Sequence, residues 1–456
     1  MRGGNEWPLV ARTIFCGVAL AGIAGCGGGG GGADAATGQG SELPGAFLST
    51  QVDESDPEAK RRQTETAPES SAAPIPAVAP AAVPAPAPAP APAPVSIAAP
   101  APAPAPVADG VGPTLADCEL FPSTAIFNTR IDDAVKFPVH ARSADWIRTI
   151  GASVPFTANW GVTDDPGNVE FYGIPYNVVD GTSATTDWPL LSYDFAPAGI
   201  SWMKGYPEGS DCAVPSGGGF AIQRGCTGVQ ASQLHFPFPK ANVLSEQGTT
   251  CDDPARCGDH HVLVVEKGSC RLWESYYSYK VAGNWYSMAT AAWDLRSHSL
   301  RPGNRASADA AGLPITPLLA KAHEAQSGEI RHALRMTLRD AAIALDWQWP
   351  ARHSAGGDNP GNVPMGALLR LKADFVIPAS WTPQARAVAT AAKRYGIYVA
   401  DNGPDFFIQG APSSAWGGWT TYENLRGISM QNMEFVDLKS VTGDPRFNPD
   451  SMQARW

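Results

Sequence analysis

The sequence predicts an α+β fold dominated by β-strands, with an antiparallel sandwich or a jelly-roll-like sheet as its core and a few covering helices. Three observations support this class. Short segments rich in β-branched and aromatic residues recur along residues 113–456, Gly and Pro separate these segments, and clear helix signals occur at only three places. Antiparallel sheet with few helices is the simplest fold that these signals allow.

Residues 1–26 predict a signal peptide of the lipoprotein type. Arg2 and Arg12 precede an uncharged run over 13–25 that is too short to span a bilayer. The run ends in "IAGC", which resembles the bacterial lipobox, and this resemblance implies lipidation of Cys26 and a membrane anchor there. Gly27 after the cysteine resembles the sorting pattern for an outer membrane or the cell surface. Secretion with cleavage nearby is the alternative.

Residues 27–112 predict a disordered tether. A glycine run leads into an acidic, Ser- and Thr-rich stretch with too little apolar surface to fold. Pro and Ala then dominate residues 74–106, so this part predicts a stiff polyproline II spacer that rises about 3.1 Å per residue and reaches roughly 100 Å. Such a reach suits a domain that meets a large extracellular substrate, although a generic spacer has the same composition.

The remaining residues, 113–456, predict a single globular exported domain, because no second linker follows. An even number of cysteines in an exported chain predicts three disulfides among six positions, namely Cys118, Cys212, Cys226, Cys251, Cys257 and Cys270.

No metal or other cofactor is expected. The run "CDDPARCGDHH" offers Cys251, Cys257, His260 and His261, but its Cys-x5-Cys spacing does not match structural zinc sites. The loops "GGDNPGN" and "ADNGPD" lack the ligand periodicity of an EF-hand, so turns are the preferred interpretation and a structural calcium site is the alternative.

The predicted elements follow in chain order. Helices are expected over 143–150 with Gly151 behind it, over "TPLLAKAHEAQSG" from Thr316, and after Thr382-Pro383, where an N-cap precedes proline and Gly396 closes the helix. Strands are expected in "FYGIPYNVV", "HHVLVVE", "CRLWESYYSY", "RHALRMTL", "LLRLKADFVI", "GIYVADNG" and "DFFIQG".

The period of two along these strands suggests a polar face that binds sugars. In "RHALRMTL", His332 shares the inward face with apolar residues, while the arginines lie on the other face. Aromatic side chains and cations on strands and loops could hold sugar rings and hydroxyls or carboxylates. The candidates are Trp273, Tyr277, Arg331, Arg335, Arg352, Arg370 and Lys372. Core packing and ordinary solvent-facing arginines are the alternative for each residue.

Hydrolysis of a glycosidic bond needs two carboxyl groups, one protonated and one ionised. The candidates are Glu274, Asp294, Asp309 and Asp401. Asp401 is preferred, because it ends an apolar strand, where burial raises the pKa of a carboxyl. The alternatives are that Asp309 stabilises a turn after Ser307, and that Asp401 forms an Asx-turn before Gly403.

A polysaccharide lyase is the second hypothesis, with His332, His353 or a tyrosine as the base and Arg or Asn neutralising a uronate. A non-catalytic glycan-binding or envelope protein is the third. Nucleotide chemistry and serine nucleophiles are disfavoured, because no Walker A motif, strand-linked G-x-G-x-x-G or G-x-S-x-G elbow occurs. The net charge of -11 argues against nucleic-acid binding.

Several blocks of the domain, among them "FNTRIDDAVKFPVHARSADWIRTIG", "SADAAGLPITPLL", "EIRHALRMTL" and "YGIYVADNGPDFFIQGAP", resemble a family of exported bacterial proteins of uncharacterised function. The resemblance covers nearly all of residues 118–440 and implies one long module. It implies no catalytic residue. The sequence therefore predicts a surface-anchored or secreted enzyme that cleaves an extracellular polysaccharide, with hydrolysis ahead of elimination.

Overall fold

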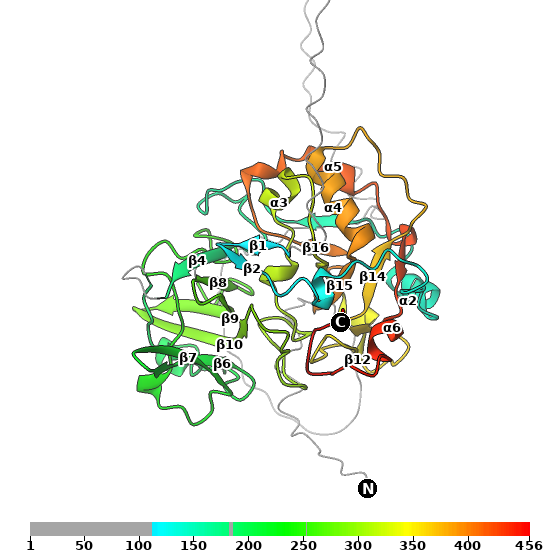
Figure 1. Cartoon of the computed structure of the whole chain (residues 1–456). Coiled ribbons are helices and arrows are strands. Elements are labelled where there is room, and N and C mark those ends of the chain that lie inside the picture. Colours follow the sequence, from blue (N-terminus) through cyan, green and yellow to red (C-terminus); the bar gives the residue numbers. More distant parts are fainter. Residues whose placement is uncertain (1–111, 182–185, 252) are drawn as a thin grey trace, which may run out of the picture. The chain divides into compact units, whose positions relative to one another are not determined.

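The computed structural model describes residues 112–181, 186–251 and 253–456. The predicted β-rich α+β class is confirmed, whereas a sandwich is not. The signal peptide, Cys26 and the tether lie outside the described residues. Figure 1 shows two main sheets, one beside the β6–β7 hairpin and one beside helices α3, α4 and α5.

The first sheet is mixed, with strand order β4-β8-β9-β10-β5 among the described residues. Its strands are β4 (Tyr176–Asp180), β8 (Val262–Lys267), β9 (Arg271–Val281), β10 (Asn284–Asp294) and β5 (Leu191–Ser192). Strands β9 and β10 form a long hairpin that turns through Ala282 and Gly283, both with positive φ (49° and 86°). A two-residue loop of this kind matches the right-handed twist of the paired strands.

The second sheet is also mixed, with order β17-β14-β15-β11-β16-β3 in the described part of the chain. Its strands are β17 (Met433–Phe435), β14 (Leu368–Leu371), β15 (Ile397–Asn402), β11 (Leu334–Leu338), β16 (Phe407–Gln409) and β3 (Thr157–Asn159). The central pair, β11 and β15, is parallel and wholly apolar on its inward positions. Parallel strands need crossovers, and the connection from β11 to β15 includes α4, which precedes β15 in the chain.

Three small ladders complete the strands: β1 (Thr114–Leu115) with β2 (Cys118–Glu119), β6 (Asp211–Ser216) with β7 (Gly219–Arg224), and β12 (Ile343–Trp347) with β13 (Val363–Met365). The helices are α2 (Ser143–Ile150), α3 (Ala322–Gln326), α4 (Pro383–Arg394), α5 (Thr420–Leu425) and α6 (Lys439–Thr442). Short 3-10 helices are η2 (Ile126–Asn128), η3 (Ala196–Ala198), η4 (Ala231–Gln233), η5 (Thr316–Leu318), η6 (Asp340–Ala342), η7 (Ser414–Trp416) and η8 (Met430–Asn432).

The helix predictions are largely confirmed. Helix α2 has the expected bounds, and α4 begins after Thr382, whose hydroxyl accepts a hydrogen bond from the Ala385 N–H. The expected helix from Thr316 divides into η5 and α3, because residues 319–321 are extended and join β16 through a bridge between Ala320 and Gly410. Strand β10 was not predicted.

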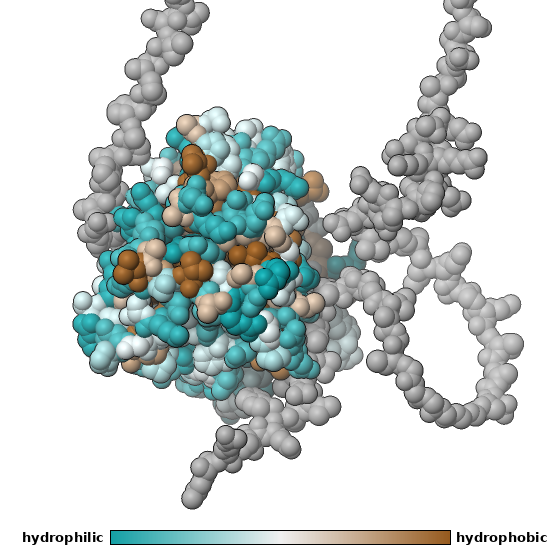
Figure 2. All heavy atoms as spheres, turned by 90° about the vertical axis from the view of Figure 1, so that its right-hand side faces the viewer, coloured by the Kyte–Doolittle hydropathy of each residue, from teal (hydrophilic) through white to brown (hydrophobic). Residues whose placement is uncertain are grey.

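One hydrophobic core joins the two main sheets. Residues of the second sheet and of α4 belong to the same buried cluster as Val265, Leu272, Ala291 and Trp293 from β8, β9 and β10. The face on the α2 and α6 side, by contrast, is mainly hydrophilic, with hydrophobic atoms in small separate groups (Figure 2). The core therefore lies between and around the sheets, which supports one folded unit for the described residues.

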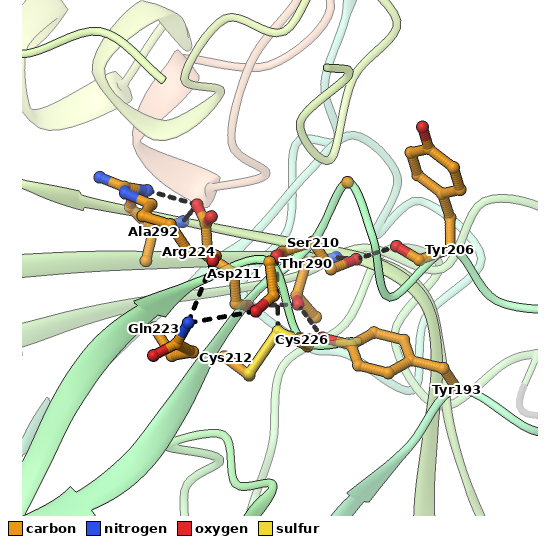
Figure 3. The surroundings of a disulfide bond; sticks show 12 residues. Tyr193, Tyr206, Ser210, Asp211, Cys212, Gln223, Arg224, Cys226, Thr290 and Ala292 are labelled. Carbon is orange, nitrogen blue, oxygen red and sulfur yellow. Dashed lines mark hydrogen bonds and ion pairs between the residues drawn. A yellow bond between two sulfur atoms is a disulfide. The ribbon is translucent and has the colours of Figure 1, made fainter. Parts of the chain in front are cut away.

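The β6–β7 hairpin is tied to β10 by the fully buried Asp211 (Figure 3). Its carboxylate accepts hydrogen bonds from Arg224, from the Ala292 N–H (3.0 Å) and from Arg301 (2.8 Å). A buried carboxylate is stable only when paired in this way. The adjacent Cys212–Cys226 disulfide closes the same hairpin.

Candidate active site

Three aspartates that are far apart in the sequence lie close together where β15 ends. Asp401 ends strand β15, Asp309 lies in the turn over 307–313, and Asp259 precedes β8. We call Asp259, Asp309 and Asp401 the acidic cluster. Each carboxylate interacts electrostatically with at least one of the others. The fold thus brings together two of the four predicted acids and one that the sequence did not indicate.

Asp309 is the buried member of the cluster. It accepts hydrogen bonds from the Ser307 hydroxyl and the Leu313 N–H, both at 3.0 Å, and from Arg335 Nη2 at 3.1 Å. Burial raises its pKa to about 7, with the charge of Asp401 adding to the shift and Arg335 opposing it. Asp309 therefore stabilises the turn, as one interpretation predicted, and its carboxyl is partly protonated at neutral pH.

Asp401 is partly open to solvent, with 20% of its side chain exposed. Its carboxylate lies 3.4 Å from Arg335 Nη2 and accepts backbone hydrogen bonds from Asn402 (3.0 Å) and Ala310 (3.3 Å). Burial raises its pKa, although Arg335 and His261 oppose the rise. The predicted Asx-turn is absent, because the Gly403 N–H donates to Leu338 instead.

Asp259 is the exposed member and was missed from the sequence. The N–H of Tyr277 donates to its backbone carbonyl at 2.7 Å, and the Tyr276 hydroxyl donates to its carboxylate at 3.1 Å. Desolvation by the surrounding chain raises its pKa to about 6, and the negative charges of Glu246 and Asp401 act in the same direction. The run "CGDHH" around Asp259 carries no sequence signal for an acid–base site, because its Cys and His residues suggest only metal binding.

His261 holds the turn that carries Asp309. Its Nδ1 lies 2.7 Å from Glu246, and its Nε2 lies 2.9 Å from the carbonyl oxygen of Ala308. Burial alone would lower the pKa of this histidine, but the charge and hydrogen bond of Glu246 outweigh it and raise the pKa to about 9. The imidazolium then donates from both nitrogens, so His261 positions the cluster and cannot act as a base at neutral pH.

The two other predicted acids lie outside the cluster. Glu274 is fully buried in β9 and accepts hydrogen bonds from the N–H groups of Ile315 (2.8 Å) and Thr316 (2.7 Å), so it caps η5. Asp294 is exposed at the end of β10 and accepts from the Arg296 N–H. Glu274 interacts electrostatically with Arg335, but its carboxylate is occupied by these hydrogen bonds in the core.

The two predicted histidines differ in position. His332 has no exposed surface and contacts Glu324 (2.9 Å), Lys321 (3.2 Å) and its neighbouring carbonyl of Ala333 (2.7 Å). It points inward, as predicted, and belongs to a buried ionic network. His353 is half-buried, and its Nδ1 lies 2.8 Å from the carbonyl oxygen of Ala310, the residue that follows Asp309. Burial lowers the pKa of His353.

Three of the arginines expected to bind substrate are buried, so neither substrate binding nor the alternative of an ordinary solvent-facing arginine fits their positions. Arg335, Arg352 and Arg370 are at most 4% exposed, because further chain segments cover the outer faces of their strands and loops. Arg352 pairs with Asp450, and Arg370 pairs with Glu434. The remaining two cations are half-buried: Lys372 donates to the Gln431 carbonyl, and Arg331 lies 4.0 Å from Glu329.

The aromatic row predicted to form a sugar-binding face is buried instead. Trp273 has no exposed surface and packs in the core between β8–β10 and the β6–β7 hairpin. Tyr277 is 5% exposed and packs with Phe195 and Tyr279. Both faces of β9 are covered, so packing explains these aromatic residues.

All six cysteines of the domain form disulfides, as predicted: Cys118–Cys270, Cys212–Cys226 and Cys251–Cys257. They indicate an oxidising, extracellular environment. The pairing of Cys251 with Cys257 removes two of the four ligands that the zinc hypothesis required. In the described ranges no group of three or more His, Cys, Asp or Glu side chains is arranged to hold a metal ion.

The described helices are all too short or too polar to cross a bilayer. Comparison of the chain with family models, with curated proteins and with solved structures found no match of any of the three kinds.

Proposed function

We propose that this protein is an exported enzyme that hydrolyses glycosidic bonds of an extracellular polysaccharide at the acidic cluster. The observation that supports it most is the environment of Asp401. This partly exposed carboxyl lies next to a buried carboxyl whose pKa is about 7 and within electrostatic reach of an exposed one whose pKa is about 6. Clustered carboxyls with raised pKa values are typical of acid–base sites.

The roles follow from exposure and charge. Asp259 is solvent-accessible and holds its proton to about pH 6, so it is suited to protonate a leaving oxygen. Burial raises the pKa of Asp401, but the guanidinium of Arg335 beside it opposes the rise, so Asp401 is suited to activate water or to attack the sugar carbon once it is ionised. Asp309 and Arg335 have no exposed side-chain surface and act as positioning residues.

Elimination receives less support from the same residues. A lyase needs a neutral histidine or an ionised tyrosine as its base. His261 is held as an imidazolium, His332 is buried in an ionic network, and the pKa of Tyr276 lies well above its usual value because of burial and the adjacent carboxylates. His353 is the remaining predicted base near the cluster.

Lipidation at Cys26 and the Pro/Ala tether remain part of the proposal. They would hold the folded domain at the cell surface within reach of a polysaccharide, whereas cleavage without lipidation would release it. Globomycin sensitivity of processing, or palmitate labelling lost in Cys26→Ser, tests the anchor separately from the chemistry.

The deciding experiment is a product screen with the purified chain on neutral and uronic-acid polysaccharides. Reducing ends without ultraviolet absorbance of unsaturated products indicate hydrolysis, whereas both signals together indicate elimination. Asp401→Asn and Asp259→Asn should abolish product formation, and the exposed Asp294→Asn should not. Binding to one polysaccharide without products from any would contradict the enzyme proposal and leave a glycan-binding protein.

A further inference from the structure

Helix α5 presents one row of side chains that is half-buried at Tyr422, which packs against the core, and exposed at its other positions. Trp419, Tyr422, Glu423 and Arg426 are spaced i, i+3, i+4 and i+7, so they lie on one side of the helix. Thr421 and Leu425 on the other side are fully buried and hold the helix in place. These four side chains therefore project from a helix that is packed firmly against the core.

The row lines a pocket of about 330 Å³, and Thr157 and Ala158 of β3 supply the opposite wall. This volume is at the low end of the range of roughly 300–1,000 Å³ that small-molecule sites occupy. Helix α5 and strand β3 are in direct contact, so two regular elements form the walls. A pocket between such elements is largely formed before a ligand arrives.

The aromatic side of the pocket is formed by Trp419, whose ring is partly exposed to solvent. Trp419 is 44% exposed, unlike the fully buried Trp160 and Trp416 behind it. Its ring is nearly parallel to that of Tyr172, with centroids 6.4 Å apart and an interplanar angle of 21°, and it also contacts Tyr422 at 4.9 Å. These neighbours fix the orientation of Trp419 while its face remains open to solvent.

The polar side of the pocket offers one hydrogen-bond acceptor and one donor group. Glu423 and Arg426 are exposed, and neither side chain makes a hydrogen bond or ion pair with any residue that the structure describes. The carboxylate can accept from a hydroxyl, and the guanidinium can donate to one. A ring with an apolar face and hydroxyls at its edge matches an aromatic plane flanked by such a pair.

We infer that this pocket binds one pyranose ring of a neutral saccharide chain, with the ring stacked on Trp419 and its hydroxyls bonded to Glu423 and Arg426. The inference goes beyond the proposed hydrolysis and does not require it. In the second sheet Thr157 pairs with Phe407, Phe407 with Thr337, and Thr337 with Asp401. Three strand spacings amount to about 14 Å, so the pocket is separate from the acidic cluster.

Calorimetric titration of the full chain carrying Asp401→Asn, which cannot turn over a substrate, tests the pocket. The probes are cellohexaose, xylohexaose, mannohexaose and chitohexaose. We expect at least one to bind, Trp419→Ala to weaken that binding at least tenfold, and Trp419→Phe to retain part of it. Trp202→Ala removes another exposed tryptophan, 65% exposed and outside the pocket, and should have no effect.

Failure of all four probes to bind would overturn the inference, as would unchanged affinity in Trp419→Ala, which would assign all binding to the acidic cluster. Circular dichroism and thermal unfolding confirm that each variant is folded. The two proposals fail separately: loss of binding in Trp419→Ala together with no hydrolysis by the wild-type chain would support the pocket and contradict the proposed enzyme.

Discussion

Asp309 Oδ2 lies 3.1 Å from Arg335 Nη2, and neither side chain has any exposed surface. The same nitrogen lies 3.4 Å from Asp401, so one guanidinium serves a buried and a partly exposed carboxylate. Burial favours the neutral form of both acids, whereas Arg335 favours the charged form. The charge of Asp401 therefore depends on how Asp309 and Arg335 are arranged behind it.

Replacing Asp401 by Asn should remove catalysis and leave the fold intact. The amide keeps the shape of the side chain but can neither carry a negative charge nor exchange a proton. We expect a loss of roughly 10²–10⁴-fold in kcat, as for removal of a general acid or base. Steady-state kinetics on the best substrate of the product screen measures the loss, with Asp294→Asn as the matched control. A kcat within threefold of wild type would place the chemistry elsewhere.

Replacing Arg335 by Met should destabilise the protein, because Asp309 and Asp401 lose their shared cation. Removing one partner of a buried ion pair typically costs about 3–5 kcal/mol in the free energy of unfolding. Denaturant unfolding at pH 8 should show the full loss. At pH 5 the loss should be smaller, because Asp309, with a pKa of about 7, is then protonated.

The double variant Arg335→Met with Asp309→Asn provides the control for this charge effect. It should recover part of the lost free energy of unfolding at pH 8, since the uncompensated carboxylate is gone. Equal instability of the single and double variants at both pH values would mean that lost packing, not charge, is responsible.

The stability of the chain should fall as the pH rises from about 4 to about 7. The pKa of Asp309 is raised from its usual 3.8 to about 7, so the folded state binds its proton more tightly than the unfolded state. This contribution is complete below pH 3.8 and is lost as the pH passes 7, and it amounts to at most about 4 kcal/mol at 1.36 kcal/mol per pH unit. Asp259, with a pKa of about 6, acts in the same direction.

Asp309→Asn should flatten this part of the profile and leave a second decline at higher pH. The pKa of His261 is raised from 6.5 to about 9, so its contribution is present below pH 6.5 and is lost as the pH passes 9. Urea unfolding between pH 4 and pH 10 separates the two. A profile unchanged by the substitution would show that Asp309 does not titrate in this range.

Local patterns predicted three of the helices and seven of the described strands, but missed other elements, including the long β10, and predicted the site only in part. Thr382 followed by proline located α4, because a cap and a fixed φ act within a few residues. The exposure of each face of β9 could not be predicted, because a period of two does not show whether other chain segments cover the polar face. In the structure such segments cover both faces and bury Trp273 and Tyr277. Arg335 is likewise buried, because β11 lies in the interior of the second sheet between β15 and β16, although the sequence of β11 alone is amphipathic.

The acidic cluster shows the same limit. Asp401 was found because an acid at the end of an apolar strand is a local signal. Asp259 lies in a loop of ordinary composition, and its pKa is raised by desolvation first and then by the charges of Glu246 and Asp401, the latter 142 positions away in the sequence. Only the fold creates that proximity.

The three disulfides should differ in their contribution to the free energy of unfolding, and this contribution should increase with the length of the loop that each one closes. Cys118–Cys270 spans 152 residues and joins β2 to the turn between β8 and β9, whereas Cys251–Cys257 spans 6. Loop-closure entropy predicts a stabilisation of about 5 kcal/mol for the first and about 2 kcal/mol for the second. Paired alanine variants of each bridge, compared by denaturant unfolding, measure both; a larger loss for Cys251–Cys257 would mean that native contacts in its loop near Asp259 outweigh the entropy of the unfolded chain.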